Sequence, residues 1–111
     1  MREQIDLLDK RILELLAARF KVATNVAVYK SKHDIPARIP SRIRTVIERR
    51  EAAARGMGLP RKTAANIWKV IVEETCRFEE GLIKDDEDRP LQADARRARG
   101  RPIATRQGSG T

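Results

Sequence analysis

The feature that most constrains this chain is an apolar seam that runs through its first thirty residues. Its members are Ile5, Leu8, Ile12, Leu15, Val22, Val26 and Tyr29. The spacing of three and four residues places these side chains along one face of a helix. The stretch contains neither Gly nor Pro, so we expect one helix over about residues 2–31, roughly 45 Å long. That length exceeds what a small monomeric domain needs, and we therefore expect the helix to pack against a second chain.

Arg19 interrupts this seam at a position where the pattern requires an aliphatic side chain. A guanidinium among apolar residues costs several kcal/mol unless an anion pairs with it. Arg2 and Lys30 lie beside the seam, near its two ends, and Glu79 is the main acid that another helix can offer. Cations therefore outnumber anions, and we expect the interior to bind a small polyanion, because the planar fork of Arg grips both oxygens of a carboxylate. Glu79 beside Glu80 also fits a solvated acidic pair.

The rest of the chain predicts two further helices and no strand. Pro36 and Pro40 define a short extended segment, after which a helix runs from Pro40 or Ser41 to about Arg55 and stops at the glycines of 56–58. A third helix opens at Leu59–Pro60 and fades between residues 81 and 84. The expected apolar faces are Ile39, Ile43, Val46 and Ile47 in the second helix, and Ala64, Ile67, Trp68, Ile71, Phe78 and Leu82 in the third. The predicted fold is all-α, with long, short and long helices that form an intertwined homodimer.

Composition divides the chain into a helical domain, residues 1–84, and a charged tail, residues 85–111. The tail is rich in Arg, Gly and Ser with few large apolar residues, so we expect it to be disordered. The net charge is +8, and residues 1–84 carry 18 Lys and Arg against 11 Asp and Glu. This balance suggests nucleic acid as a partner. No dense basic run with aromatics supports it, however, and the 56–60 link lacks the compact form of a helix-turn-helix, so a nucleic-acid-binding module is the weaker hypothesis.

Cysteine and histidine usage excludes several kinds of site. Cys76 is the single cysteine, which excludes an intrachain disulfide, predicts core packing for this residue and favours a reducing, cytoplasmic location. We expect no membrane span and no signal peptide. His33 is the single histidine and has no Cys close to it in the sequence. We therefore expect no metal, no cofactor and no Ser/His/Asp or Cys/His catalytic group.

The other candidate residues each have an ordinary structural interpretation as well. Arg2, near the terminus, and Arg42, in a basic helix, fit a solvated surface. Lys30 fits the stabilisation of carbonyls at a helix end, and Thr75 fits a hydrogen bond to the preceding turn. Only Arg19 resists such an interpretation. A purely structural coiled-coil dimer is a further hypothesis, and it predicts that Arg19→Leu stabilises the protein at no cost in activity.

Several segments together resemble the all-helical, type II chorismate mutases. The segments are REQIDLLD at 2–9, LLAAR at 15–19, VYK at 28–30 and IVEET at 71–75, with Pro36, Arg42, Leu59 and Glu79 at matching positions. The resemblance covers about residues 2–83 and requires no gap. Because members of this family are intertwined dimers of three-helix chains, the resemblance implies the same fold here.

The resemblance also implies a role for each matching residue. Arg19 and Arg2 of the partner subunit bind the carboxylates of the substrate, a small dicarboxylate. Lys30 reaches a carboxylate and the ether oxygen whose bond breaks. Arg42 lies in the substrate-binding motif of the second helix, and Thr75 stands where the family has a small hydroxyl residue near a carboxylate.

The implied reaction fits a site without a nucleophile. Conversion of chorismate to prephenate is a [3,3] rearrangement, which requires a folded substrate conformer and stabilisation of charge on the ether oxygen. Lys30 and Glu79 are the candidate catalytic residues, with Glu79 against the ether oxygen. Glu79 can donate a hydrogen bond only when it is protonated. We therefore expect activity to fall as rising pH removes this proton, and Glu79→Gln to flatten the pH profile.

Two residues depart from the family pattern. Typical members carry an Asp and a Glu that contact the C4 hydroxyl of the substrate, and Ile39 and Ile43 occupy those positions here. The protein is then a less selective chorismate mutase of the shikimate pathway and aromatic amino acid biosynthesis, or an antibiotic-pathway mutase that acts on 4-amino-4-deoxychorismate. A third possibility is an isochorismate pyruvate lyase, which the loop at 35–37 resembles. A shifted helix register would bring in Asp34 or Glu48, although both are badly placed.

Overall fold

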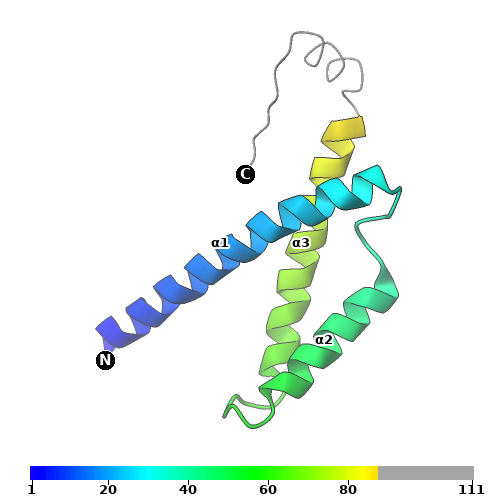
Figure 1. The fold of residues 1–111 in the computed structure, drawn as a ribbon. Coiled ribbons are helices and arrows are strands. Elements are labelled where there is room, and N and C mark those ends of the chain that lie inside the picture. Colours follow the sequence, from blue (N-terminus) through cyan, green and yellow to red (C-terminus); the bar gives the residue numbers. More distant parts are fainter. Residues whose placement is uncertain (88–111) are drawn as a thin grey trace.

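The computed structural model describes residues 1–87, which form three α-helices joined by two short loops (Figure 1). The helices are α1 (Arg2–Lys32), α2 (Pro40–Ala54) and α3 (Thr63–Glu87), and the described residues contain no strand. The predicted all-α order of long, short and long helices is therefore confirmed. Residues 88–111 of the predicted tail lie outside the described residues, and residues 85–87 continue α3.

A Schellman motif ends α1 and turns the chain back beside Lys30. Asp34 has a φ of 55°, a left-handed conformation that Asp tolerates better than most residues. The Ile35 N–H donates to the Lys30 carbonyl at 2.8 Å, and the Asp34 N–H donates to the Ser31 carbonyl at 3.5 Å. These bonds satisfy carbonyls at the helix end that have no partner in the helix. The loop that follows therefore starts next to Lys30.

Proline opens α2 as predicted. Ile39 is extended, with φ −122° and ψ 104°, as expected of a residue that precedes proline. Pro40 is the first residue of α2, and the Ile43 N–H donates to the Ile39 carbonyl at 3.0 Å. Beyond the helix, Gly56 and Gly58 have φ values of 87° and 80°, which side chains with a Cβ rarely adopt. The predicted glycine stop of the second helix is thus confirmed.

The predicted start of the third helix at Leu59–Pro60 is wrong, because α3 begins at Thr63. Lys62 has a φ of 73°, which interrupts any helical path from Pro60. The Thr63 N–H donates to the Pro60 carbonyl at 3.1 Å and closes a turn, and the Asn66 N–H donates to the Lys62 carbonyl at 3.0 Å. The fixed φ of proline suits such a turn as well as a first helical position, so the residue type alone could not separate them.

The core lies along α3, which packs against both α1 and α2, while α1 and α2 make almost no contact with each other (Figure 1). The buried apolar residues are Ala23, Ala27, Ala37, Ala64, Ala65, Val72 and Cys76, and none of the large side chains described is fully buried. Phe20 of α1 and Phe78 of α3 meet edge to face, with ring centroids 5.2 Å apart. Ile67, predicted to be buried, is 47% exposed, because the buried side of α3 is centred on Ala65, Val72 and Cys76.

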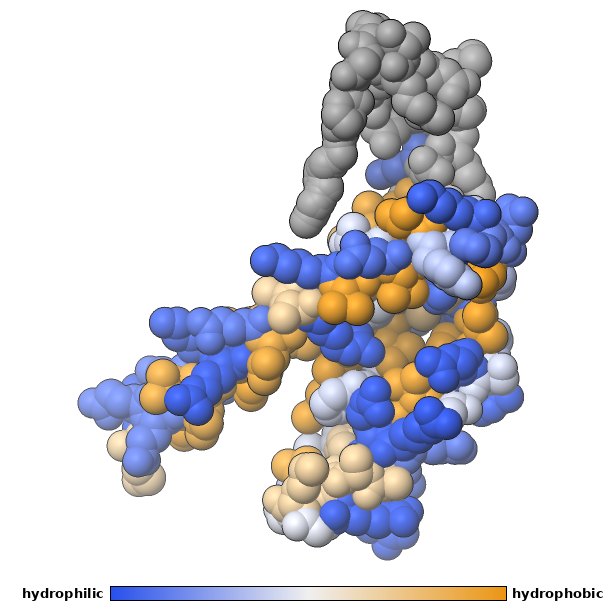
Figure 2. All heavy atoms as spheres, in the orientation of Figure 1, coloured by the Kyte–Doolittle hydropathy of each residue, from blue (hydrophilic) through white to orange (hydrophobic). Residues whose placement is uncertain are grey.

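The seam of α1 is largely uncovered by the other described residues. Its seven apolar members are between 36% and 71% exposed, and every residue from 1 to 15 is exposed. The first half of α1 projects away from α2 and α3 as an arm that carries apolar side chains (Figures 1 and 2). The radius of gyration is 17.7 Å, against about 13 Å for a compact chain of this length. No helix among the described residues has the length and hydrophobicity needed to cross a membrane.

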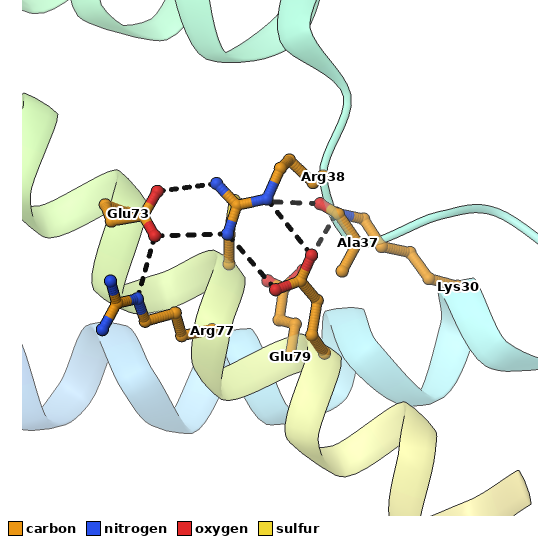
Figure 3. Close-up of polar contacts among 8 residues, drawn as sticks. Lys30, Ala37, Arg38, Glu73, Arg77 and Glu79 are labelled. Carbon is orange, nitrogen blue, oxygen red and sulfur yellow. Dashed lines mark hydrogen bonds and ion pairs between the residues drawn. The ribbon is translucent and has the colours of Figure 1, made fainter.

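Arg38 ties the α1–α2 loop to α3 through two carboxylates. Its Nη1 and Nη2 donate to the two oxygens of Glu73 at 2.6 and 3.3 Å, and its Nε and Nη2 donate to Glu80 at 3.2 Å each (Figure 3). Arg77 Nε also donates to Glu73, at 2.9 Å. Hydrogen bonds from Arg38, and then from Arg77, lower the pKa of Glu73 from 4.5 to about 2.

We expect this network to stabilise the fold only while Glu73 is ionised. The pKa of Glu73 is lower in the folded than in the unfolded chain, so the free energy of unfolding should decrease as the pH falls from 4.5 towards about 2. Urea unfolding across this range measures the decrease. Glu73→Gln should make it shallower, whereas Glu74→Gln, an exposed neighbour on α3, should leave it unchanged. An equal decrease in wild type and Glu73→Gln would contradict the assignment.

Candidate active site

A cavity of about 240 Å³ lies between the three helices and brings together seven of the eight candidate site residues. They are Arg19, Lys30, Ile39, Arg42, Ile43, Thr75 and Glu79. Two larger hollows, of about 490 and 450 Å³, lie beside the α1–α2 loop and at the α2–α3 turn. Of the eight candidates, those hollows contain only Lys30, so the 240 Å³ cavity is the candidate site.

Arg19 enters the cavity from α1 and meets Thr75 of α3. Its Nη1 donates to the Thr75 hydroxyl at 2.8 Å, and that hydroxyl donates to the Ile71 carbonyl one turn earlier at 2.7 Å. The expected bond from Thr75 to the preceding turn is thus present, and the same oxygen orients the guanidinium. Arg19 forms no ion pair among the described residues. Most of its five N–H donors therefore remain available to a ligand.

Lys30 and Glu79 form a buried ion pair at the crossing of α1 and α3. Lys30 Nζ lies 2.9 Å from Glu79 Oε1, and the two side chains are 19% and 6% exposed. Lys30 Nζ also donates to the Ala37 carbonyl at 3.0 Å (Figure 3). The interpretation of Glu79 as a solvated acid is wrong, because Glu79 is the one charged side chain buried among the described residues, while Glu80 is exposed. An ammonium has three donors, so Lys30 retains one N–H for a ligand.

The α2 wall of the cavity is largely apolar. Ile39, at the start of α2, and Ile43, one turn later, are half-buried and line the cavity beside Val46. Arg42 lines it from the same helix, is exposed, and has no side-chain hydrogen bond or ion pair within residues 1–87. The lining therefore carries three cations, Arg19, Lys30 and Arg42, against the single carboxylate of Glu79, which gives a net charge of +2.

Arg2 is the candidate that the chain does not bring to the cavity. It is the first residue of α1, is exposed, and lies at the far end of the projecting arm (Figure 1). Arg19 lies seventeen positions further along the helix, a rise of about 25 Å along the axis. Within one chain these two guanidinium groups cannot contact the same small molecule.

Two contributions to the site were not visible in the sequence. The Ala37 carbonyl accepts from Lys30, and a backbone acceptor in a loop has no signature in residue type. Arg38 anchors that loop through Glu73 and Glu80, which lie two turns apart on one side of α3. Their spacing was readable, but their partner on another element was not. Cys76 is buried as predicted and also lines the cavity, and burial raises the pKa of its thiol.

Comparison with known proteins gives consistent matches. The family model of chorismate mutase type II matches residues 1–80. A 4-amino-4-deoxychorismate mutase of Streptomyces venezuelae is 33% identical over 72% of this chain and 78% of that protein. The T-protein of Enterobacter agglomerans is 29% identical over 71% of this chain but only 21% of its own length. A chorismate mutase of Methanocaldococcus jannaschii is 22% identical over 80% of this chain and 90% of that protein.

No solved structure matches the chain significantly. The family match nevertheless spans most of the chain and includes every residue that lines the candidate cavity. The chain belongs to the type II chorismate mutase family and is an isomerase.

Proposed function

We propose that the protein catalyses the [3,3] rearrangement of chorismate to prephenate, and of 4-amino-4-deoxychorismate to its prephenate analogue, in a homodimer. The observation that carries this proposal is the charge of the cavity. Three cations and one carboxylate leave a net +2, which complements the two carboxylates of a chorismate-like substrate. Seven of the eight candidate site residues line this cavity, and the rearrangement requires no nucleophile or base.

In the proposed reaction the ether C–O bond breaks as a new C–C bond forms within the same molecule. No proton or electron is exchanged with the protein, so its task is to hold the folded conformer and stabilise charge on the ether oxygen. Arg19 and Arg2 of the partner subunit bind the carboxylates. The free N–H of Lys30 reaches the ether oxygen, and Glu79, as the carboxylate partner of Lys30, orients it.

The second copy of the chain supplies what one chain lacks. Antiparallel packing of two α1 helices, with Ile5 facing Leu15 and Leu8 facing Ile12 of the partner subunit, covers the first four members of the exposed seam with their own copies, as a twofold interface requires. The same register brings Arg2 level with residues 18–19 of the other α1. Arg2 therefore reaches the cavity that contains Arg19 in the partner subunit. The exposure of the seam and the available donors of Arg19 support this arrangement.

The α2 wall of the cavity is the part of the site that we expect to contact the C4 substituent of the substrate. By the family pattern Ile39 and Ile43 face C4, and neither side chain accepts a hydrogen bond. Such a wall does not distinguish a hydroxyl from an amino group by hydrogen bonding, so we propose that both substrates react. Relatives named 4-amino-4-deoxychorismate mutase, from Streptomyces venezuelae and from Streptomyces pristinaespiralis at 26% identity, support the second substrate.

We expect the purified protein to convert chorismate and 4-amino-4-deoxychorismate into products of unchanged mass, which mass spectrometry and absorbance will follow. Lys30→Met should lower kcat by about 10²–10³-fold, because the main donor to the ether oxygen is lost. Lys69→Met, on an exposed part of α3, is the control and should be neutral. Release of pyruvate from isochorismate would show that the protein is a lyase and not the proposed mutase. No turnover of any of the three compounds would end the proposal.

We expect the Arg2→Ala variant and the Arg19→Ala variant each to be inactive alone. When the two purified variants are mixed, activity should return. When subunits exchange in an equal mixture, half of the dimers are mixed and each contains one intact site, so about a quarter of wild-type activity should return. An equal mixture of Arg19→Ala and Arg42→Ala is the control and should stay inactive, because both residues belong to the same chain's site. Mixed dimers without recovered activity would contradict a shared site.

We expect Ile43→Glu to raise kcat/KM for both substrates by about tenfold, because it supplies a hydrogen-bond acceptor at C4 worth about 1.5 kcal/mol. The control is Ile47→Glu, the same change one turn further along α2 at a residue that does not line the cavity. If a folded Ile43→Glu variant has unchanged or lower kcat/KM while Ile47→Glu matches wild type, the apolar wall does not face C4.

A further inference from the structure

We propose that Arg38 is a positioning residue: by clamping the α1–α2 loop to α3, it holds the Ala37 carbonyl against Lys30, so that the ammonium presents a single free N–H to the substrate. The inference rests on the proposed function, since it concerns how Lys30 is aimed at the ether oxygen. Arg38 does not line the 240 Å³ cavity, and it acts through the neighbouring residue.

The loop depends on side chains for its position. Backbone hydrogen bonds tie Ile35 to the end of α1 and Ile39 to the start of α2. Among the described residues, no backbone–backbone hydrogen bond joins residues 36–39 to α1 or α3. Two side-chain contacts tie the loop to α3: the Cys76 thiol lies 4.0 Å from the Ala37 carbonyl, which is a weak contact, and Arg38 makes four hydrogen bonds to Glu73 and Glu80. Because the guanidinium is planar and spans both carboxylates, it fixes the direction of the loop as well as its distance from α3.

The adjacent residue faces the site. Ala37 is buried at 8% exposure, and its carbonyl accepts from Lys30 Nζ at 3.0 Å. Figure 3 shows the Ala37 carbonyl beside the Lys30 ammonium, with Arg38 between Ala37 and Glu73; the ammonium also donates to Glu79 at 2.9 Å. The three N–H bonds of an ammonium are tetrahedrally arranged, so two fixed acceptors determine the direction of the third. Without the carbonyl, the Lys30 ammonium could swing about its hydrogen bond to Glu79. The third N–H would then have no fixed direction.

The kinetic consequence falls on kcat rather than KM. A donor aimed at the ether oxygen contributes most when charge develops there, whereas the carboxylates are bound by Arg19 in ground and transition states alike. Displacement by about 1 Å of a positioned group can cost up to 10²-fold in rate. Loss of Arg38 should therefore lower kcat and leave KM nearly unchanged. A merely stabilising residue should change neither, once the variant is folded.

The test compares Arg38→Met with Arg77→Met in the full-length protein. Both variants lose an arginine that binds Glu73, but Arg77 belongs to α3 and does not contact the loop. We expect kcat of Arg38→Met to fall by about tenfold or more with KM within about twofold, and Arg77→Met to match wild type. If Arg38→Met does not fold, Arg38→Lys replaces it, because one ammonium cannot span both carboxylates. Equal kinetics of the two folded variants would overturn the proposal.

A second readout separates this inference from the proposed function. The rate at which acetic anhydride acetylates the Lys30 amine, measured by peptide mass spectrometry, reports how firmly the group is held without any turnover. We expect faster labelling of Lys30 in the Arg38 variant than in wild type or Arg77→Met, with other lysines unchanged. Unchanged labelling would overturn the positioning role even in an active enzyme. An inactive wild type with faster labelling in the variant would instead refute the proposed function alone and support the Arg38 clamp.

Discussion

At the crossing of α1 and α3, one buried carboxylate faces three cations. Glu79 neutralises Lys30 at 2.9 Å, which leaves Arg19 and Arg42 without an anionic partner among the described residues. Burying Lys30 alone would be costly, and breaking a buried pair typically costs about 3–5 kcal/mol. The pair therefore lets a lysine occupy the interior, and the remaining positive charge is what a dicarboxylate can neutralise. The same arrangement serves the fold and the proposed chemistry.

The helices surround this charge without closing over it. Only α3 contacts both other helices, and the buried apolar residues are small. The exposed apolar seam of α1 and the extended shape mean that one chain buries too little of its own apolar surface. In the proposed homodimer, a second copy would cover the first half of the seam and bring Arg2 to the cavity, so that the core and the site would be completed together. Stability and activity should then share a dependence on protein concentration.

The sequence predicted the features that depend on local pattern. Helical periodicity located the seam, the misplaced Arg19 indicated a charged interior, and Pro40 marked the start of α2. The features that depend on a partner in space were not predictable: Lys62 in a left-handed turn delayed α3, and Ile67 is exposed because the buried side of α3 is centred on Ala65, Val72 and Cys76. The clamp of Arg38 and the carbonyl of Ala37 also required the three-dimensional arrangement, since neither is marked by spacing along one helix.

Binding of an unreactive dicarboxylate analogue of chorismate tests the charge argument most directly. Isothermal titration calorimetry on wild type and Arg19→Met measures both stoichiometry and affinity without chemistry. The account predicts one molecule bound per chain in wild type and a loss of at least about tenfold in affinity in Arg19→Met, equal to about 1.4 kcal/mol. Equal affinity of the two proteins, or no binding to wild type, would contradict it.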